Sequence, residues 1–292
     1  MPVMEFAYHA PATLAEACAL GRQWGAEAQF LAGGTELLPD YYRERECAKH
    51  LIALEGVSEL HGIAVVGKRL RIGALTTVAE VAASPLVREW LPALTLAARS
   101  LGSPPIRSRA TIGGNFCRAV ACADLPPPAI VGETVLRIVG SGEPRELEAE
   151  RFFLSPRKTV LGAGEVLVEF MVPRQPSRSG SSYQRFARRS GSSLAVASVA
   201  ARLTLQSGRI AAARIALGAV APVPRLAVRA AEMLAGERPS ADLFALAGAV
   251  CAEEALPISD LRGSAEFRRE LVSVLARRAF EEATRRAGAE AA

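Results

Sequence analysis

The glycine pair Gly33-Gly34 constrains the fold of this chain more than any other sequence feature. The apolar segment 28–32 stops at the pair, and the segment after Thr35 and Glu36 is apolar again. Adjacent glycines expose consecutive backbone N–H groups without side chains in the way, so an anion such as a diphosphate can bind the main chain there. A tight turn from a strand into a helix, with Thr35 as the N-cap, explains the same residues.

The segments around this pair predict a small parallel unit. Thr13 and Glu16 have the spacing of a capping box, and an amphipathic helix follows as far as Gly25. Short buried strands are expected at 28–32 and 50–54, with a helical segment at 41–49 between them. Strand, helix and strand in this order indicate a parallel βαβ unit, and ligands of such units bind where the first strand ends, which is the position of the glycine pair.

The next region predicts an antiparallel sheet with helices. A hairpin is expected at 63–67 and 69–74, helices at 76–84 and 85–101, and three further strands at 134–139, 145–147 and 165–173. The segment 103–128 is rich in proline and glycine and is too long to be a mere connection. Irregular segments of this length are usually functional.

The last third of the chain predicts a separate sheet and three helices. A polar linker is expected at 174–182, followed by two long strands at 183–205 and 209–220 and by amphipathic helices at 226–236, 241–256 and 266–286. We therefore expect an α+β (mixed α/β) fold with an N-terminal βαβ-type subdomain (1–57), a second subdomain (58–175) and a C-terminal domain with an antiparallel sheet and helices (181–292).

A second glycine pair, Gly113-Gly114, repeats the pattern of the first. It follows the β-branched Thr111 and precedes Asn115, and Asp124 lies nine residues further on. Two glycine loops from different domains would clamp one extended, phosphate-bearing ligand, with Thr111 or Asp124 holding its hydroxyl or amide groups. A β-turn that needs glycine for positive φ explains this second pair equally well.

Composition excludes several other classes of protein. The net charge is +5, but only three of the 35 basic residues are lysine, and no aromatic residues interleave with a basic stripe, so nucleic-acid binding is not expected. No apolar run approaches the ~18 residues of a membrane span, and the start of the chain does not resemble a signal peptide. The five cysteines have no framework spacing, which favours reduced thiols and a cytoplasmic location.

The sequence contains no recognisable catalytic or metal-binding set. Cys117 and Cys122 have no further cysteines nearby to complete a cluster, and the three histidines lack ligand spacing. No Ser-His-Asp set, G-x-G-x-x-G fingerprint or P-loop is present. These absences favour a protein that holds a cofactor over an acid–base catalyst.

Taken together, the motifs resemble those of a known family. In order along the chain they are LAGGTELLP, IGALTTVAEV, SPPIRSRATIGGNFC with ADLPP, EVLVEFMVP, YQRF, RIALGAVAPVPRLA and FRRELVSVLARRA. This series is similar to the FAD-binding medium subunits of the molybdenum hydroxylases, of the xanthine dehydrogenase and carbon monoxide dehydrogenase type. The resemblance covers almost the whole chain.

The resemblance implies that FAD lies in a cleft with its diphosphate on the first glycine loop. The residues that match the family's cofactor site are Ala32, Gly33, Gly34, Thr35, Glu36, Leu37, Leu101, Thr111, Gly114, Asn115, Asp124, Leu167 and Arg185. Three positions depart from the family: Leu101 replaces an aromatic residue of some members, Arg185 a common lysine, and Ser193 a frequent aspartate. Asn115 and Asp124 are too close together to hold the extra iron–sulfur insertion of some relatives.

The resemblance also implies a division of labour among subunits. A large subunit would carry the molybdenum cofactor and a small subunit two [2Fe-2S] clusters, in a heterotrimer. This chain would pass electrons through FAD to NAD or another acceptor, such as a quinone. A free-standing flavin oxidoreductase and a flavin-free scaffold subunit are the alternatives.

Overall fold

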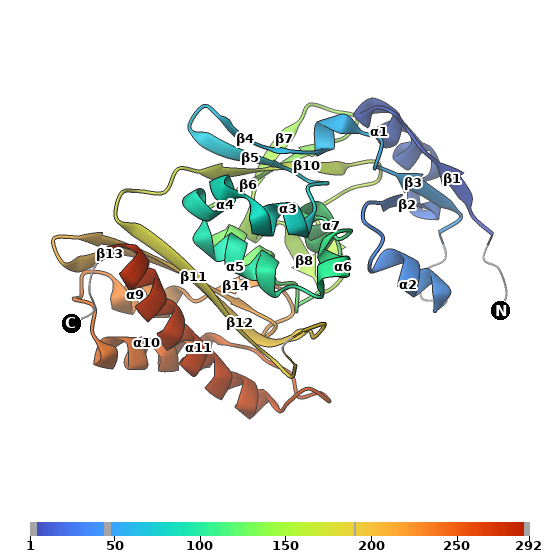
Figure 1. The fold of residues 1–292 in the computed structure, drawn as a ribbon. Helices are drawn as coiled ribbons and strands as arrows, with labels where there is room; N and C mark the ends of the chain where they lie inside the picture. The colour runs from blue at the N-terminus through green and yellow to red at the C-terminus, as the bar shows by residue number, and fades with distance from the viewer. Residues whose placement is uncertain (1–4, 44–47, 190, 289–292) are drawn as a thin grey trace.

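The computed structural model describes residues 5–43, 48–189 and 191–288 (Figure 1). Within them, three sheets follow one another along the chain, and β8 (Phe153–Ser155) and β9 (Lys158–Thr159) form a separate two-stranded sheet. The combination of one parallel sheet with antiparallel sheets and helices confirms the predicted α+β class. No helix in this part of the chain is long and apolar enough to cross a membrane.

The first sheet is parallel, and the first glycine pair follows one of its edge strands. The strand order is β1 (Ala7–His9), β3 (His50–Ala53) and β2 (Ala28–Leu31). β2, the helix α2 (Leu37–Tyr42) and β3 form the predicted βαβ unit. The sequence pattern does not predict β1, because three residues are too few to show a strand period.

One of the two helices in this region agrees with the sequence prediction, and the other agrees only in part. α1 (Leu14–Trp24) begins at Thr13, whose side chain accepts a hydrogen bond from the N–H of Glu16 at 3.2 Å, as predicted. α2 covers only the first residues of the predicted helical segment 41–49, of which 44–47 lie outside the described residues.

The second sheet is antiparallel and contains the predicted strands. Its order is β4 (Ile63–Val66), β5 (Arg69–Gly73), β10 (Val166–Pro173), β6 (Val135–Val139) and β7 (Arg145–Glu148). The capped helix α3 (Val78–Ala83) follows the β4–β5 hairpin, and its N-cap Thr77 forms a full capping box with Glu80. The hairpin and this helix confirm the sequence reading of the region.

The prediction of one helix at 85–101 is wrong. The structure has two helices, α4 (Pro85–Trp90) and α5 (Pro92–Ser100), which meet at Leu91. Pro92 has no backbone N–H, and its ring disfavours a helical conformation at the preceding residue, so Leu91 has φ −149° and ψ 76°.

The prediction of an irregular loop at 103–128 is also wrong. Two short helices lie within it and a third begins in it: α6 (Pro104–Arg107), α7 (Ile112–Cys117) and α8 (Pro126–Val131). Proline fits the first turn of a helix, where the missing N–H has no partner in any case, and α6 and α8 both begin in this way. The prolines that indicated a loop are therefore helix-initiating residues.

The third sheet has more strands than the sequence predicts. Its order is β11 (Ser179–Ala187), β12 (Ala195–Gln206), β13 (Arg209–Gly218) and β14 (Arg225–Leu226), all antiparallel. The predicted strand at 183–205 is thus two strands, β11 and β12. The predicted linker at 174–182 is too long, because β11 already begins at Ser179 and its serines at 181 and 182 are buried.

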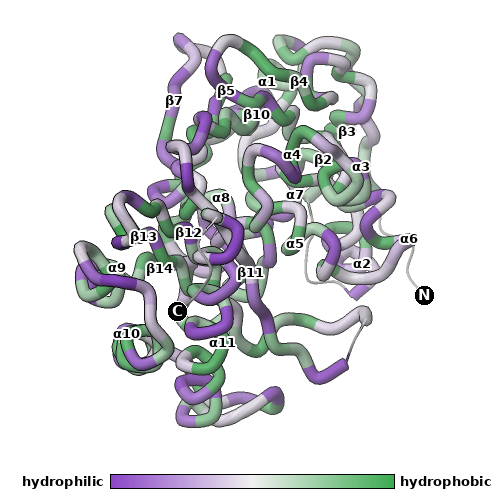
Figure 2. Tube along the Cα trace, turned by 60° about the vertical axis from the view of Figure 1, so that its left-hand side comes forward, coloured by the Kyte–Doolittle hydropathy of each residue, from purple (hydrophilic) through white to green (hydrophobic). Residues whose placement is uncertain are grey.

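Helices cover both faces of this third sheet. α9 (Val228–Leu234) and α11 (Ala265–Arg286) pack on one face with α10 (Ala241–Glu254) behind them, while α5 and α8 contact the other face. In Figure 2 hydrophobic and hydrophilic residues alternate around α11. The layers are close: a Cβ atom built on Gly180 would lie 2.0 Å from the carbonyl oxygen of Ala283 on α11. Glycine is therefore required on β11 at this contact.

A buried arginine fixes the loop before α11. Arg268 is 2% exposed and donates to the carbonyl oxygens of Val196 and Ala219 at 3.1 and 3.0 Å, and to the Asp260 carboxylate at 2.5 Å. Asp260 also accepts from Arg262 at 2.7 Å. The hydrogen bonds from Arg262, and then from Arg268, hold the pKa of the Asp260 carboxyl well below its usual range.

This depressed pKa gives a prediction for acid stability. Asp260 contributes stability above its unfolded-state pKa of about 3.9, and the contribution is lost progressively as the pH falls below that value. We expect Asp260→Asn to lower the urea midpoint at neutral pH, and the difference from wild type to shrink as the pH falls below about 4. The same change at the exposed Asp242 serves as the control. A difference that is constant with pH would contradict the assignment.

Candidate functional site

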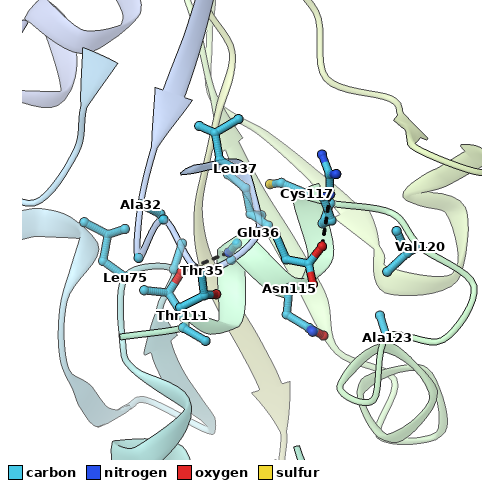
Figure 3. A pocket seen from close by; sticks show the side chains of 18 of the residues that line it. Ala32, Thr35, Glu36, Leu37, Leu75, Thr111, Asn115, Cys117, Val120 and Ala123 are labelled. Atoms are coloured by element: carbon cyan, nitrogen blue, oxygen red, sulfur yellow. Dashed lines mark hydrogen bonds and ion pairs between the residues drawn. The ribbon is translucent and has the colours of Figure 1, made fainter. Parts of the chain in front are cut away.

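A cavity of about 510 Å³ lies between the first glycine loop and the second sheet (Figure 3). Its volume is in the range of small-molecule sites, roughly 300–1,000 Å³. Twelve of the thirteen predicted site residues line it, namely Ala32, Gly33, Gly34, Thr35, Glu36, Leu37, Leu101, Thr111, Gly114, Asn115, Asp124 and Leu167. The thirteenth, Arg185, lines a smaller neighbouring cavity of about 280 Å³.

The first glycine loop presents a row of backbone donors. Among the described residues, the N–H groups of Gly33, Gly34, Thr35 and Glu36 donate no hydrogen bond to the protein. Gly34 has φ +72°, and the carbonyl group of Gly34 accepts from the N–H of Leu38 at 3.1 Å as the chain enters α2. Successive free N–H groups that line a cavity are the arrangement that binds anions.

Gly33 brings the two predicted loops into contact. A Cβ atom at this position would lie 1.8 Å from the carbonyl oxygen of Arg109 and 2.6 Å from its carbonyl carbon. Both are backbone atoms, so rotation of a side chain cannot relieve the clash. The missing side chain at Gly33 is therefore what lets the first loop lie against the start of the second.

The second glycine pair does not repeat the chemistry of the first, contrary to the sequence expectation. It lies in the first turn of α7, where the N–H of Gly113 donates to Ala74 at 2.8 Å and that of Gly114 to the Thr111 hydroxyl at 3.0 Å. Neither glycine has positive φ. A Cβ atom on Gly113 would lie 2.7 Å from the Ala74 carbonyl oxygen, so this glycine is needed for close packing. The second loop forms a wall of the cavity and offers no row of free donors.

Asp124 is a buried carboxylate in the cavity wall. It is 6% exposed, and it accepts hydrogen bonds from the Tyr183 hydroxyl at 2.7 Å and from the Arg185 guanidinium at 3.2 Å. Burial raises the pKa of the Asp124 carboxyl above its usual value, while Arg185 and then Tyr183 oppose that rise. Asn115, on the same wall, accepts from the N–H of Leu125 at 3.3 Å.

Acidic and basic side chains pair with one another beside the first glycine loop. The Glu36 side chain is 59% exposed, and its carboxylate lies 3.5 Å from the guanidinium of Arg118. Arg118 also pairs with the buried Asp40, which pairs in turn with Arg157 at 2.9 Å. Figure 3 shows Thr35, Glu36, Thr111 and Asn115 in the middle of the view, with Ala32 and Leu75 to their left and Val120 and Ala123 to their right. Among the described residues, the Arg118 guanidinium thus lies between the carboxylates of Glu36 and Asp40, beside the backbone donors of the first glycine loop.

Sequence reasoning missed much of the lining. Leu75, Cys117, Val120, Cys122 and Ala123 also face the cavity. Isolated apolar side chains carry no sequence signal that separates a cavity wall from the core. Within the described residues, no three His, Cys, Asp or Glu side chains gather as a metal site.

Comparison with known families divides the chain into two parts. Residues 4–175 match the family described as FAD binding domain in molybdopterin dehydrogenase. Residues 181–283 match the family described as CO dehydrogenase flavoprotein C-terminal domain.

Individual relatives are similar along their whole length. The xanthine dehydrogenase FAD-binding subunit of Escherichia coli O157:H7 is 32% identical over 285 residues, which cover 96% of this chain and 97% of the relative. The carbon monoxide dehydrogenase medium chain of Hydrogenophaga pseudoflava is 32% identical over 278 residues, or 95% and 96% of the two chains.

Solved structures share the fold. A chain of carbon monoxide dehydrogenase from Hydrogenophaga pseudoflava superimposes with a TM-score of 0.94 at 33% identity and covers 98% of this chain and 99% of its own. A chain of quinoline 2-oxidoreductase from Pseudomonas putida 86 gives a TM-score of 0.92 at 32% identity, with the same coverage.

Proposed function

Because this chain belongs to the family of FAD-binding medium subunits of molybdopterin dehydrogenases, we propose that it holds FAD in the cavity beside its two glycine loops and serves as the electron-transfer subunit of a molybdenum hydroxylase complex. Bound there, FAD would supply electron exchange between the [2Fe-2S] clusters of a partner subunit and an external acceptor, NAD or another carrier. Substrate oxidation would take place on a different chain.

The row of free N–H groups from Gly33 to Glu36 is the observation that carries this proposal. A diphosphate has several anionic oxygens in line, and each charge-assisted hydrogen bond to one of them contributes about 1.5–3 kcal/mol. The loop needs no lysine or arginine for this task, because main-chain donors at fixed positions supply it. Binding of the FAD diphosphate would thus depend on the positions of these backbone N–H groups.

The other predicted residues have assignable tasks in the same proposal. Polar atoms of Thr111, Asn115 and Asp124 also line the cavity, and hydroxyl and N–H groups of FAD would find acceptors there. Four apolar side chains would contact FAD and exclude water from it, namely Ala32, Leu37, Leu101 and Leu167. Leu101 cannot stack as an aromatic residue would, so contact on that side depends on shape alone.

We also propose the wider organisation that this function requires. The partners would be a large subunit with the molybdenum cofactor and a small subunit with two [2Fe-2S] clusters, in a cytoplasmic heterotrimer. Along this chain, the proposed parts are 1–57, 58–175 and 181–292. The three sheets fall within them, except that β11 starts at Ser179, two residues before the third part.

Purification of the native protein together with the subunits and cofactors that remain bound to it tests this proposal. We expect a yellow complex that contains molybdenum and iron in stoichiometric amounts and releases FAD on denaturation. A lone chain that turns over an organic substrate would contradict the subunit assignment in favour of a free-standing flavin enzyme. A colourless chain that takes up no added FAD would leave only the scaffold alternative.

A further inference from the structure

Three buried polar side chains lead from the cavity wall into the third sheet. Asp124 lies in the wall, and Tyr183 and Arg185 stand behind it on β11, two residues apart on one face of the strand. Each carboxylate oxygen of Asp124 has a different donor: Tyr183 bonds Oδ1 at 2.7 Å, and Arg185 bonds Oδ2 at 3.2 Å. The orientation of this carboxylate is therefore set from β11.

Neither donor lines the large cavity itself. Tyr183 is 4% exposed, and the Arg185 side chain, which is 9% exposed, faces the smaller cavity. Arg185 is held by two further acceptors, the carbonyl oxygen of Ser100 at 2.6 Å and that of Ser193. Tyr183 therefore reaches a ligand in the large cavity through Asp124, and Arg185 reaches it through Asp124 and through Ser193, which lines that cavity.

We propose that Tyr183 and Arg185 are positioning residues for FAD, which hold the Asp124 carboxylate in one orientation toward the cavity. This inference depends on the proposed FAD site. It changes the role that the family resemblance implies for Arg185 from lining the cofactor to acting behind it. It also adds Tyr183, the first residue of the YQRF motif, which is absent from the predicted site residues. The third sheet, which begins beyond the FAD-binding domain match at 4–175, thereby completes the cofactor site.

The alternative is that this set only joins the third sheet to the rest of the protein. Other contacts already serve that purpose away from the cavity: the Arg202–Glu133 ion pair at 2.6 Å, the Arg214–Glu150 pair at 2.8 Å, and the hydrogen bond from Ala93 N–H to the Ser181 hydroxyl at 3.1 Å. A purely structural role would change stability but would not couple to Asp124 in ligand binding.

A double-mutant cycle on FAD affinity separates the two roles. FAD is titrated into the flavin-free full-length chain and binding is followed by flavin fluorescence, for wild type, Tyr183→Phe, Asp124→Asn and the double variant. Tyr183→Phe removes one hydroxyl and is expected to weaken FAD binding about tenfold, because a hydrogen bond to a charged group contributes on that order. Asp124→Asn should have an effect of similar size, and the double variant should be no weaker than Asp124→Asn alone.

Two further variants test the role of Arg185. Arg185→Met should weaken FAD binding, and Arg185→Lys, which keeps a cation beside Asp124, should restore most of it. Tyr42→Phe removes an exposed hydroxyl and is the control for the tyrosine change. Unfolding in urea checks that each variant is folded.

The possible outcomes distinguish this inference from the proposed function. Wild-type FAD affinity in Tyr183→Phe would overturn the positioning role. So would a double variant that binds FAD about a hundredfold more weakly than wild type, because the effects of Tyr183→Phe and Asp124→Asn would then be independent. If the wild-type chain itself bound no FAD, the proposed function would fail instead.

Discussion

Gly34→Asp is expected to remove FAD from the protein. The substitution places a carboxylate beside the free N–H groups of Gly33 to Glu36, where the proposal puts the diphosphate. Loss of two charge-assisted hydrogen bonds, at about 1.5–3 kcal/mol each, corresponds to a decrease in affinity of at least ~100-fold. The measurement is FAD titration of the flavin-free chain, together with the flavin content of the protein as purified.

Gly34→Asn is the matched control for this experiment. Gly34 has φ +72°, a conformation that Asn and Asp tolerate better than other non-glycine residues, so backbone strain should be similar in the two variants. Asn also has nearly the same size as Asp but no charge. We expect Asn to weaken binding by about tenfold or less, in line with strain of roughly 1–2 kcal/mol. Equal losses in both variants would show that shape, not charge, is decisive, and normal FAD content in Gly34→Asp would place the diphosphate elsewhere.

Gly33→Ala is expected to damage both the fold and the site. The new methyl group would lie 1.8 Å from the Arg109 carbonyl oxygen, so the first glycine loop and the segment before α7 would have to separate. Overpacking against backbone usually costs about 1–3 kcal/mol, and this contact is close enough to reach the upper end. Urea unfolding of the flavin-free chain should show that loss, and FAD binding should weaken because the cavity is opened.

Gly142→Ala is the control for the alanine change. A Cβ atom there meets nothing within 4 Å, and neither Gly33 nor Gly142 has positive φ, so the two variants differ only in the space available. Gly142→Ala should unfold and bind FAD as wild type does. A Gly33→Ala variant with wild-type stability would mean that the two loops do not touch in the folded protein.

The sequence predicts most of the strands and the long C-terminal helices, and it fails mainly where one element ends and the next begins. Strand patterns correctly indicate the βαβ unit and the antiparallel second sheet, because alternation and glycine-bounded apolar runs are local signals. The segment 103–128 misleads because a proline marks a loop and a helix start alike. The prediction of one strand at 183–205 overlooks Gly191, Ser192 and Ser193, turn residues that lie between β11 and β12.

For the site, the glycine loops are predictable and their surroundings are not. Gly33 and Gly34 stand out because two adjacent glycines after a strand have few explanations. The sequence cannot show that the second pair uses its N–H groups inside the protein, since Ala74, the acceptor for Gly113, lies far away in the chain. The YQRF motif contains Tyr183, but the sequence cannot assign its role, which depends on a contact with Asp124 across 59 positions.

A crystal structure of the full-length chain grown with FAD tests the central claim most directly. The account predicts density for the diphosphate against the N–H groups of Gly33 to Glu36, with the rest of the cofactor in the cavity that Thr111, Asn115 and Asp124 line. Density for FAD at any other place on the chain, or a cavity that stays empty at saturating FAD, would contradict it.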